Sequence, residues 1–213
     1  MPQPHVILTA MASLDGRTDS ERPDRLSNRL EEYRIQELRG RVDAVLTSSA
    51  RVMQENPEFP VKEVSGREPA IVVVDKEADT PPEAAFLKNQ ARKVILVTSR
   101  KANRNRVGRI QEKRPGMEVM SLGEYAVNLE DMLWELHRGG LRNVLLEGDA
   151  DLDMRMLGHG LVNEVYLMVA PVLLGETQPA VFDGKLEKDI HLELDGILQY
   201  GDHVVLHYHV RSR

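Results

Sequence analysis

Cysteine is absent from the 213 residues, which excludes disulfide bonds, a thiol nucleophile and a zinc site built on thiolates. No apolar run is long enough to span a membrane, and the first residues lack the basic and apolar regions of a secretory signal. The formal net charge of -6 argues against general binding to nucleic acid or to anionic membranes. These absences predict a soluble protein of the cytoplasm.

Internal repeats, low-complexity tracts and interdomain linkers are also absent. A chain of this length fits one well-filled domain and would be short for two. The longest irregular segment, residues 56–68, is therefore predicted to be a loop and not a boundary. We expect a single domain over residues 1–213.

The strands are indicated by apolar runs rich in Val, Ile and Leu. Runs without polar alternation are typical of strands buried on both faces, and hence of a mostly parallel sheet. They cover residues 5–10, 43–48, 70–75, 93–99, 143–148 and 164–175. Helical patterns lie between them, at residues 27–39, from Arg51 to Asn56, from Leu129 to Leu136, and at residues 152–159.

The end of the chain has a different pattern. Residues 190–198 and 203–210 alternate apolar and polar side chains around a short turn. This alternation predicts an antiparallel hairpin that is open to water on one face. The expected fold class is α/β, with a mostly parallel central sheet flanked by helices and a C-terminal antiparallel hairpin.

Candidate ligand-binding residues follow the predicted strands, because ligands collect at the carboxyl ends of parallel strands. Ser99, Arg100 and Lys101 lie where a strand meets a helix, so backbone N–H groups and two cations could bind a nucleotide phosphate there. A solvated basic helix face is the alternative. Gly148 could admit a ligand close to the backbone, or could form an ordinary turn. Neither G-x-G-x-x-G nor a Walker A pattern is present, which excludes an ordinary Rossmann or P-loop site.

Two further features have a simple structural interpretation beside a functional one. Asp15-Gly16 is typical of a turn, and could also place a carboxylate beside a substrate hydroxyl. His207 and His209 share a face of the predicted hairpin. A metal site would require a third convergent ligand, so we interpret them as surface strand residues and predict no metal site.

Four segments, taken in order, resemble the reductase family of riboflavin biosynthesis. "AMASLDGR" is similar to the family's S-x-D-G-[KR] opening, and "ELRGRVDAVLTSSARVMQENP" to its L-R, D-A-[IV] and D-[DN]-P pattern. "NVLLEGDADL" is similar to [IL]-x-x-E-G-G, and "GLVNEVYLMVAPVLLG" to L-[VI]-D-E followed by P-x-[LI]-[LI]-G. The resemblance runs from about Pro4 to Val210. It implies a dihydrofolate-reductase-like fold.

The resemblance also implies an activity, namely NADPH-dependent reduction of a ribosylamino-pyrimidine 5′-phosphate to its ribitylamino form by a homodimer. A hydride would reach C1′ of the sugar, and the protein would mainly orient the reactants. No deaminase precedes the domain, and the lack of cysteine excludes its zinc centre, which favours the 2,5-diamino-pyrimidinone substrate over the 5-amino-uracil one. Two alternatives stay open. They are a reductase with another small substrate and a nucleotide-binding homologue without catalysis.

The family's functional residues carry over to matching positions of this chain. Asp15 is placed at the substrate as the catalytic residue. Ser27, Arg39 and Lys62 are the implied substrate contacts, and the two cations suit the 5′-phosphate. The implied cofactor-binding residues are Arg51, Glu55, Ser99, Arg100, Glu147, Gly148, Asp149 and Leu152.

Four of these positions depart from the family pattern, which usually has Thr at Arg51, Asp at Glu55, Arg at Lys62 and Gly at Asp149. A carboxylate beside a pyrophosphate is repulsive. We therefore hypothesise that Arg51 compensates for Asp149, either by neutralising it or by contacting the phosphate. The rival arrangement is local, with Arg51 paired to Glu55 one helical turn later.

Overall fold

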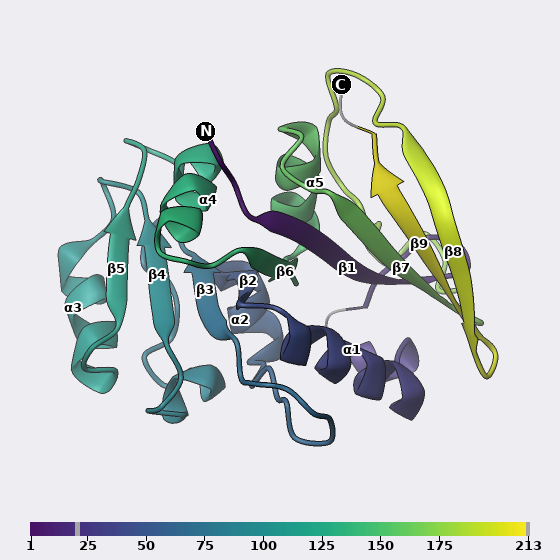
Figure 1. Cartoon of the computed structure of the whole chain (residues 1–213), viewed down its shortest axis with the longest axis horizontal. Helices are drawn as coiled ribbons and strands as arrows, with labels where there is room; N and C mark the ends of the chain where they lie inside the picture. The colour runs from purple at the N-terminus through teal and green to yellow at the C-terminus, as the bar shows by residue number, and fades with distance from the viewer. Residues whose placement is uncertain (20–21, 212–213) are drawn as a thin grey trace.

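The computed structural model describes residues 1–19 and 22–211. Within them, nine strands form one sheet in the order β5-β4-β3-β2-β6-β1-β7-β9-β8 (Figure 1). The strands are β1 (His5–Ser13), β2 (Ala44–Ser48), β3 (Ala70–Val74), β4 (Val94–Thr98), β5 (Glu118–Ser121), β6 (Asn143–Leu146), β7 (Glu164–Ala170), β8 (Leu192–Tyr200) and β9 (His203–Val210). All neighbours pair in parallel except β7 with β9 and β8 with β9, which are antiparallel. The predicted fold class is confirmed.

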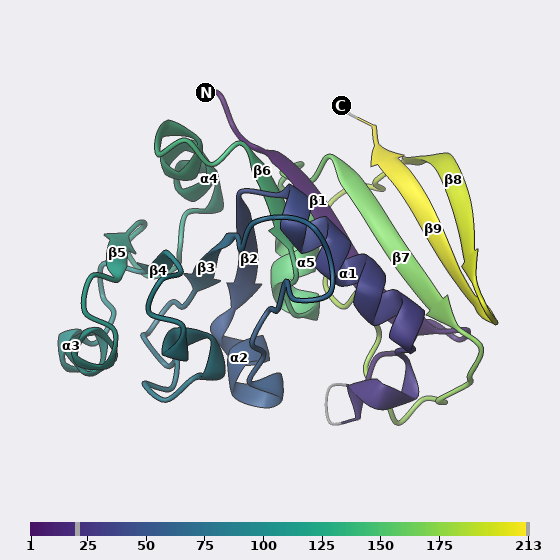
Figure 2. The ribbon, with the colours of Figure 1, turned by 60° about the horizontal axis from the view of Figure 1, so that its bottom comes forward.

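Helices cover both faces of the sheet (Figure 2). The α-helices are α1 (Arg29–Arg41), α2 (Ser49–Glu55), α3 (Arg104–Lys113), α4 (Leu129–Arg138) and α5 (Ala150–Gly158), and η1 (Pro23–Arg25) and η2 (Ala85–Lys88) are short 3-10 helices. Val52 of α2 and Ile110 of α3 pack in one hydrophobic cluster with β2, β3 and β4. Met132 of α4 and Met156 of α5 pack in a second cluster with β1 and β6. The two clusters place α2 and α3 on one face of the sheet, and α4 and α5 on the other.

The helix starts are fixed by capping side chains. Asn28 accepts a hydrogen bond from the backbone N–H of Glu31 at 2.8 Å, so α1 begins two residues later than the pattern predicts. Ser48 caps α2 by accepting from the N–H of Arg51 at 3.1 Å. Asn56 ends α2 in the left-handed conformation, with φ of 46°. These caps fix the direction from which α1 and α2 approach the sheet.

Three differences from the sequence pattern have clear physical reasons. The apolar run at residues 164–175 forms a strand only as far as Ala170, because Pro171 follows and has no N–H to continue the ladder. β5 has only four residues and partly polar composition, which gives it a weak sequence signal. The helix after β4 begins at Arg104, behind a short turn capped by Asn103. Ser99 and Arg100 therefore lie in that turn and not at the helix start.

None of the helices in the part of the chain that the structure describes has the length and apolar composition needed to cross a lipid bilayer.

Candidate active site

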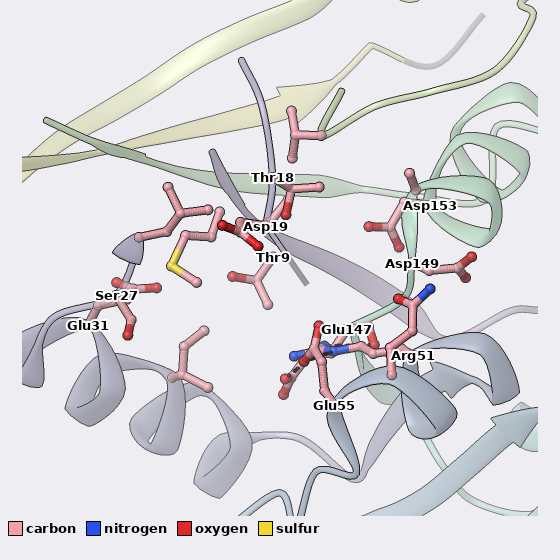
Figure 3. Close-up of a pocket in the computed structure, with 18 of the residues that line it drawn as sticks. Thr9, Thr18, Asp19, Ser27, Glu31, Arg51, Glu55, Glu147, Asp149 and Asp153 are labelled. Carbon is pink, nitrogen blue, oxygen red and sulfur yellow. Dashed lines mark hydrogen bonds and ion pairs between the residues drawn. The ribbon is translucent and has the colours of Figure 1, made fainter. Parts of the chain in front are cut away.

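A cavity of about 490 Å³ opens at the carboxyl end of β6, between α1, α2 and the start of α5 (Figure 3). β1 contributes Thr9, Ala10 and Met11 to its wall, and Pro179 and Val181 come from the segment after β7. The neighbouring order β2-β6-β1 brings these elements together, although they are far apart in sequence. The cavity therefore has the position at which α/β sheets hold ligands.

Glu147, which directly follows β6, is the charged centre of the cavity wall. Its side chain is only 2% exposed. Arg39 of α1 donates two hydrogen bonds to it, from Nε to Oε1 and from Nη2 to Oε2, each of 2.7 Å. Burial would raise the pKa of Glu147, but Arg39 and then Arg51 outweigh it and lower that pKa. Glu147 is therefore held ionised in a buried position.

Arg51 of α2 has a second set of contacts at this centre. Its Nη1 donates to the backbone oxygen of Glu147 at 2.9 Å and lies 3.3 Å from Oε2 of the same residue. Its Nε donates to Oε2 of Glu55 at 2.9 Å. Among the described residues no ion pair joins Arg51 to Asp149. The rival local pair with Glu55 is thus present in the structure, together with a contact to Glu147, and the hypothesised pairing with Asp149 is not.

Asp153 of α5 is a cavity residue that the sequence did not indicate. It is 4% exposed, its side chain extends from α5 toward the cavity (Figure 3), and its Oδ1 has no hydrogen-bond partner among the described residues. Burial raises the pKa of Asp153 well above its ordinary value, against the opposing effect of Arg51, and Asp149 and Glu147 add to the rise. Burial thus shifts the Asp153 carboxyl toward its neutral form, whose O–H could donate to a ligand.

The spacing of "GDADLD" is the one signal that could have identified Asp153. Asp149 and Asp153 are four residues apart, so both lie on the same side of the first turns of α5. The Asp153 carboxyl also explains Gly148. A Cβ atom added at Gly148 would overlap the Asp153 carboxyl, so the missing side chain makes room for it.

The structure brings seven of the twelve implied site residues to the cavity. They are Ser27, Arg39, Arg51, Glu55, Glu147, Gly148 and Asp149. The other five do not line it: Asp15, Lys62, Ser99, Arg100 and Leu152. The binding and catalytic roles of all twelve stay predictions, since no ligand contact is described.

Asp15 and Lys62 both have contacts away from the cavity. The Asp15 carboxylate accepts hydrogen bonds from Ser13 Oγ at 2.5 Å, from the N–H of Leu174 at 3.1 Å and from the N–H of Gly175 at 2.8 Å. These bonds, with that of Ser13 first, lower the pKa of Asp15 to about 2. Lys62 is exposed, with Nζ 3.5 Å from Oε2 of Glu58. In the structure Asp15 thus ties the turn after β1 to the segment after β7.

The turn after β4 borders a second, smaller hollow of about 330 Å³. Ser99 is buried at its edge, and Lys76, Lys101 and Arg106 border it, paired with the carboxylates of Glu77, Glu124 and Asp79 respectively. Arg100 is exposed beside it, while Leu152 is a core residue, 2% exposed, that packs in the cluster with α4 and α5. Of the basic residues that follow β4 in the sequence, Lys101 and Arg106 therefore line a hollow separate from the cavity.

The fold and the cavity define a class: an α/β protein with a charged cavity at the carboxyl edge of a parallel sheet. The family model of the RibD C-terminal domain matches residues 4–206. The chain belongs to this family.

Curated relatives cover the full length of the chain. The chain is 32% identical over 219 residues to the 2,5-diamino-6-ribosylamino-4(3H)-pyrimidinone 5′-phosphate reductase of Methanothermobacter thermautotrophicus, covering 99% of this chain and 100% of that protein. It is 27% identical to the protein of the same name from Aquifex aeolicus, covering 100% and 99%.

Solved structures share the fold. RibD of Acinetobacter baumannii superposes with a TM-score of 0.83 at 22% identity, covering 99% of this chain and 59% of that one. The riboflavin biosynthesis reductase of Saccharomyces cerevisiae superposes with a TM-score of 0.76 at 18% identity, covering 98% and 90%. Dihydrofolate reductase of Enterococcus faecalis superposes with a TM-score of 0.53 at 9% identity, covering 99% and 98%. The dihydrofolate-reductase-like fold expected from the sequence is confirmed.

Proposed function

We propose that the protein is an NADPH-dependent reductase that converts 2,5-diamino-6-ribosylamino-4(3H)-pyrimidinone 5′-phosphate to its ribitylamino form. Family membership and the names of the full-length relatives support this substrate. The cavity built around Glu147 and Gly148 is the observation on which the proposal rests, because the family pattern for the cofactor site falls on these residues.

The residues present fit a nicotinamide dinucleotide. Gly148 lines the cavity beside the Asp153 carboxyl, and the Oδ1 of Asp153, which has no partner among the described residues, offers a hydrogen bond to a polar group bound there. Lys101 and Arg106 at the second hollow suit a phosphate. β4 is three strand spacings from β6 in the sheet, about 14 Å at the usual spacing, which an extended dinucleotide can bridge.

When bound, the cofactor supplies the hydride for C1′ of the opened sugar. The chain's own residues have positioning roles. The two buried ion pairs of Glu147 hold α1 and α2 against β6 and fix the width of the cavity. Ser27 and Thr9 present hydroxyls to the cavity, and Asp153 would present a protonated carboxyl. The expected result is a substrate fixed by several polar groups beside the nicotinamide.

Asp149 counts against a dinucleotide at this cavity and so favours the alternative of a homologue without catalysis. It lines the cavity at the start of α5, and its side chain makes no capping hydrogen bond. A carboxylate at this position opposes a pyrophosphate. We also infer that two copies associate and that the protein acts in the cytoplasm, as the family resemblance suggests.

One experiment separates these functions. The purified chain is titrated with NADPH and with NADH, and cofactor oxidation is then followed with the diamino-pyrimidinone or the amino-uracil substrate. We expect tighter binding of NADPH and oxidation with the diamino-pyrimidinone. A Gly148→Ala variant should lose both, because the new methyl group would displace Asp153. NADPH binding without oxidation would support the non-catalytic alternative, and no binding at all would overturn the proposal.

A further inference from the structure

Five polar side chains from four neighbouring strands form a connected group on one face of the sheet, the histidine–carboxylate cluster. Its members are His5 of β1, Glu164 of β7, Asp195 of β8, and His207 and His209 of β9. His5 Nε2 lies 2.6 Å from Glu164 Oε1, and His207 Nε2 lies 2.8 Å from Glu164 Oε2. On its other side, His207 Nδ1 lies 2.9 Å from Asp195 Oδ2, and His209 Nε2 lies 3.5 Å from Asp195 Oδ1.

The strand register produces this convergence. Glu164 is directly opposite His209, and Tyr166 is opposite His207, so alternate residues of β7 and β9 meet on one face. A register shift between Leu194 and Gly196 lets Asp195 join the same face from β8. The third ligand that the sequence pattern lacked is Glu164, which is 43 residues before His207 and is brought to it only by the fold.

The group is partly buried and well oriented. The side chains of Glu164 and His207 are 16% and 14% exposed. The Tyr166 ring stacks on the His207 ring with centroids 4.0 Å apart, which fixes the plane of that imidazole. The guanidinium of Arg34 lies 5.5 Å from the centroid of the Tyr166 ring. It is already paired with Glu31 by hydrogen bonds of 2.7 and 2.5 Å.

The donor atoms of the cluster suit a transition metal, because three imidazoles and two carboxylates meet at one place on the sheet. Imidazole together with carboxylate is a donor set typical of zinc and its neighbours among the transition metals.

We propose that this cluster is a transition-metal site of the zinc class, with Glu164, His207 and His209 as ligands. One ligand atom from each of the three lies within 4.8 Å of the others. A tetrahedral zinc site brings donor atoms to about 3.4 Å, so ligation requires shifts of roughly an ångström, which side-chain rotation provides. The fourth position is left to water, and His5 and Asp195 act as outer hydrogen-bond partners. Bound metal would tie β9 to β7 and so hold the terminal hairpin to the parallel sheet.

The test uses the full chain without an affinity tag, first treated with a chelator. Zn²⁺ binding is measured by calorimetry, and Co²⁺ binding by its visible spectrum, which reports nitrogen and oxygen ligation directly. We expect one equivalent of metal per chain with micromolar affinity, and a thermal midpoint that rises with Zn²⁺. His209→Gln and Glu164→Gln should each weaken binding at least tenfold.

His159→Gln is the matched control, because His159 is exposed at the end of α5, on the opposite face of the sheet. It should leave affinity, spectrum and midpoint unchanged. If Glu164→Gln does not fold, the affinity of His209→Gln for metal tests the proposal instead. Half of the His209 side chain is exposed, so its replacement leaves the core intact. The proposal is overturned if the unaltered chain shows no saturable binding below millimolar metal, or if His159→Gln weakens binding as much as His209→Gln.

Discussion

At the residue scale, the most consequential contact is the buried pair of Arg39 with Glu147. Arg39→Ala would leave Glu147 buried with Arg51 alone, so we expect a loss of about 3 kcal/mol in the free energy of unfolding, at the low end for breaking a buried ion pair. Lys62→Ala removes an exposed cation and should leave that free energy unchanged. Urea unfolding of both variants measures the difference.

The same two variants test the implied phosphate contacts. If Arg39 and Lys62 hold the substrate phosphate, both variants raise KM for the substrate far more than they weaken NADPH binding. If Arg39→Ala loses stability with unchanged kinetics, its role is the ion pair alone. The structure favours a structural part for Arg39, because both bonds of its fork go to Glu147.

The raised pKa of Asp153 predicts an unusual dependence of stability on pH. A carboxyl whose pKa is higher in the folded state binds its proton more tightly there, so stability falls as pH rises above the unfolded value of 3.8. The charged groups that face it are Arg51 of α2, Glu147 directly after β6, and Asp149, and burial outweighs the attraction of Arg51. Asp153→Asn mimics the neutral form and should therefore stabilise the protein at neutral pH, because it removes the cost of burying the charged carboxylate.

The gain from Asp153→Asn should shrink as pH falls toward 3.8. Asp151→Asn is the control, because Asp151 is on the same helix, is exposed and, among the residues that the structure describes, pairs with Arg155 alone. Chemical unfolding across a range of pH is the measurement. A gain that is constant with pH, or equal for Asp151→Asn, would show that the pKa of Asp153 is not raised in the folded protein.

At the element scale, the cap of α2 links local structure to the cavity. Ser48 Oγ accepts from the N–H of Arg51, and α2 carries both Arg51 and Glu55 into the cavity wall. Ser48→Ala should cost about 1 kcal/mol of stability and weaken NADPH binding, because the first turn of α2 loosens. Ser49→Ala is the control, since Ser49 makes no side-chain hydrogen bond within the described ranges. If both variants lower stability and NADPH binding equally, the capping hydrogen bond of Ser48 is not the cause.

The elements that the sequence predicted best are those whose pattern is local. The continuous apolar runs of β2, β3 and β4 are buried at every position, and each was recognised from composition alone. β5 is not predicted from the sequence, because its four residues of mixed polarity are too few to show the alternation of a strand. The sequence predicts the start of α3 directly after β4, but the helix begins at Arg104. Nothing in the basic run after β4 distinguishes the turn before Asn103 from the first turn of a helix.

At the scale of the whole molecule, pairings across long sequence separations could not be predicted. Arg39 and Glu147 are 108 residues apart and meet because β6 lies between β2 and β1. The resemblance indicated both residues as site residues, but nothing in the sequence shows that they pair with each other. Nothing in the sequence shows that Glu164 and His207 pair either, because they become neighbours only when β9 pairs antiparallel to β7.

The edge of the sheet carries the last prediction. β8 is the edge strand beyond β9, and Leu192, Leu194, Ile197 and Leu198 on it are all exposed. Unpaired backbone groups together with apolar side chains make such an edge a template for association, so we expect the contact of the proposed homodimer to use β8. Ile197, 61% exposed, is the most exposed of the four.

Ile197→Lys should therefore convert the dimer to a monomer, as measured by light scattering after size exclusion, with little loss of thermal stability because the side chain is outside the core. Leu14→Lys is the matched control, since Leu14 is an exposed apolar residue, 68% accessible, in the turn after β1. A dimer that survives Ile197→Lys would place the contact elsewhere on the surface. The added charge works by preventing the burial of β8 against a second copy. If the unaltered chain is already a monomer, the proposed homodimer is excluded.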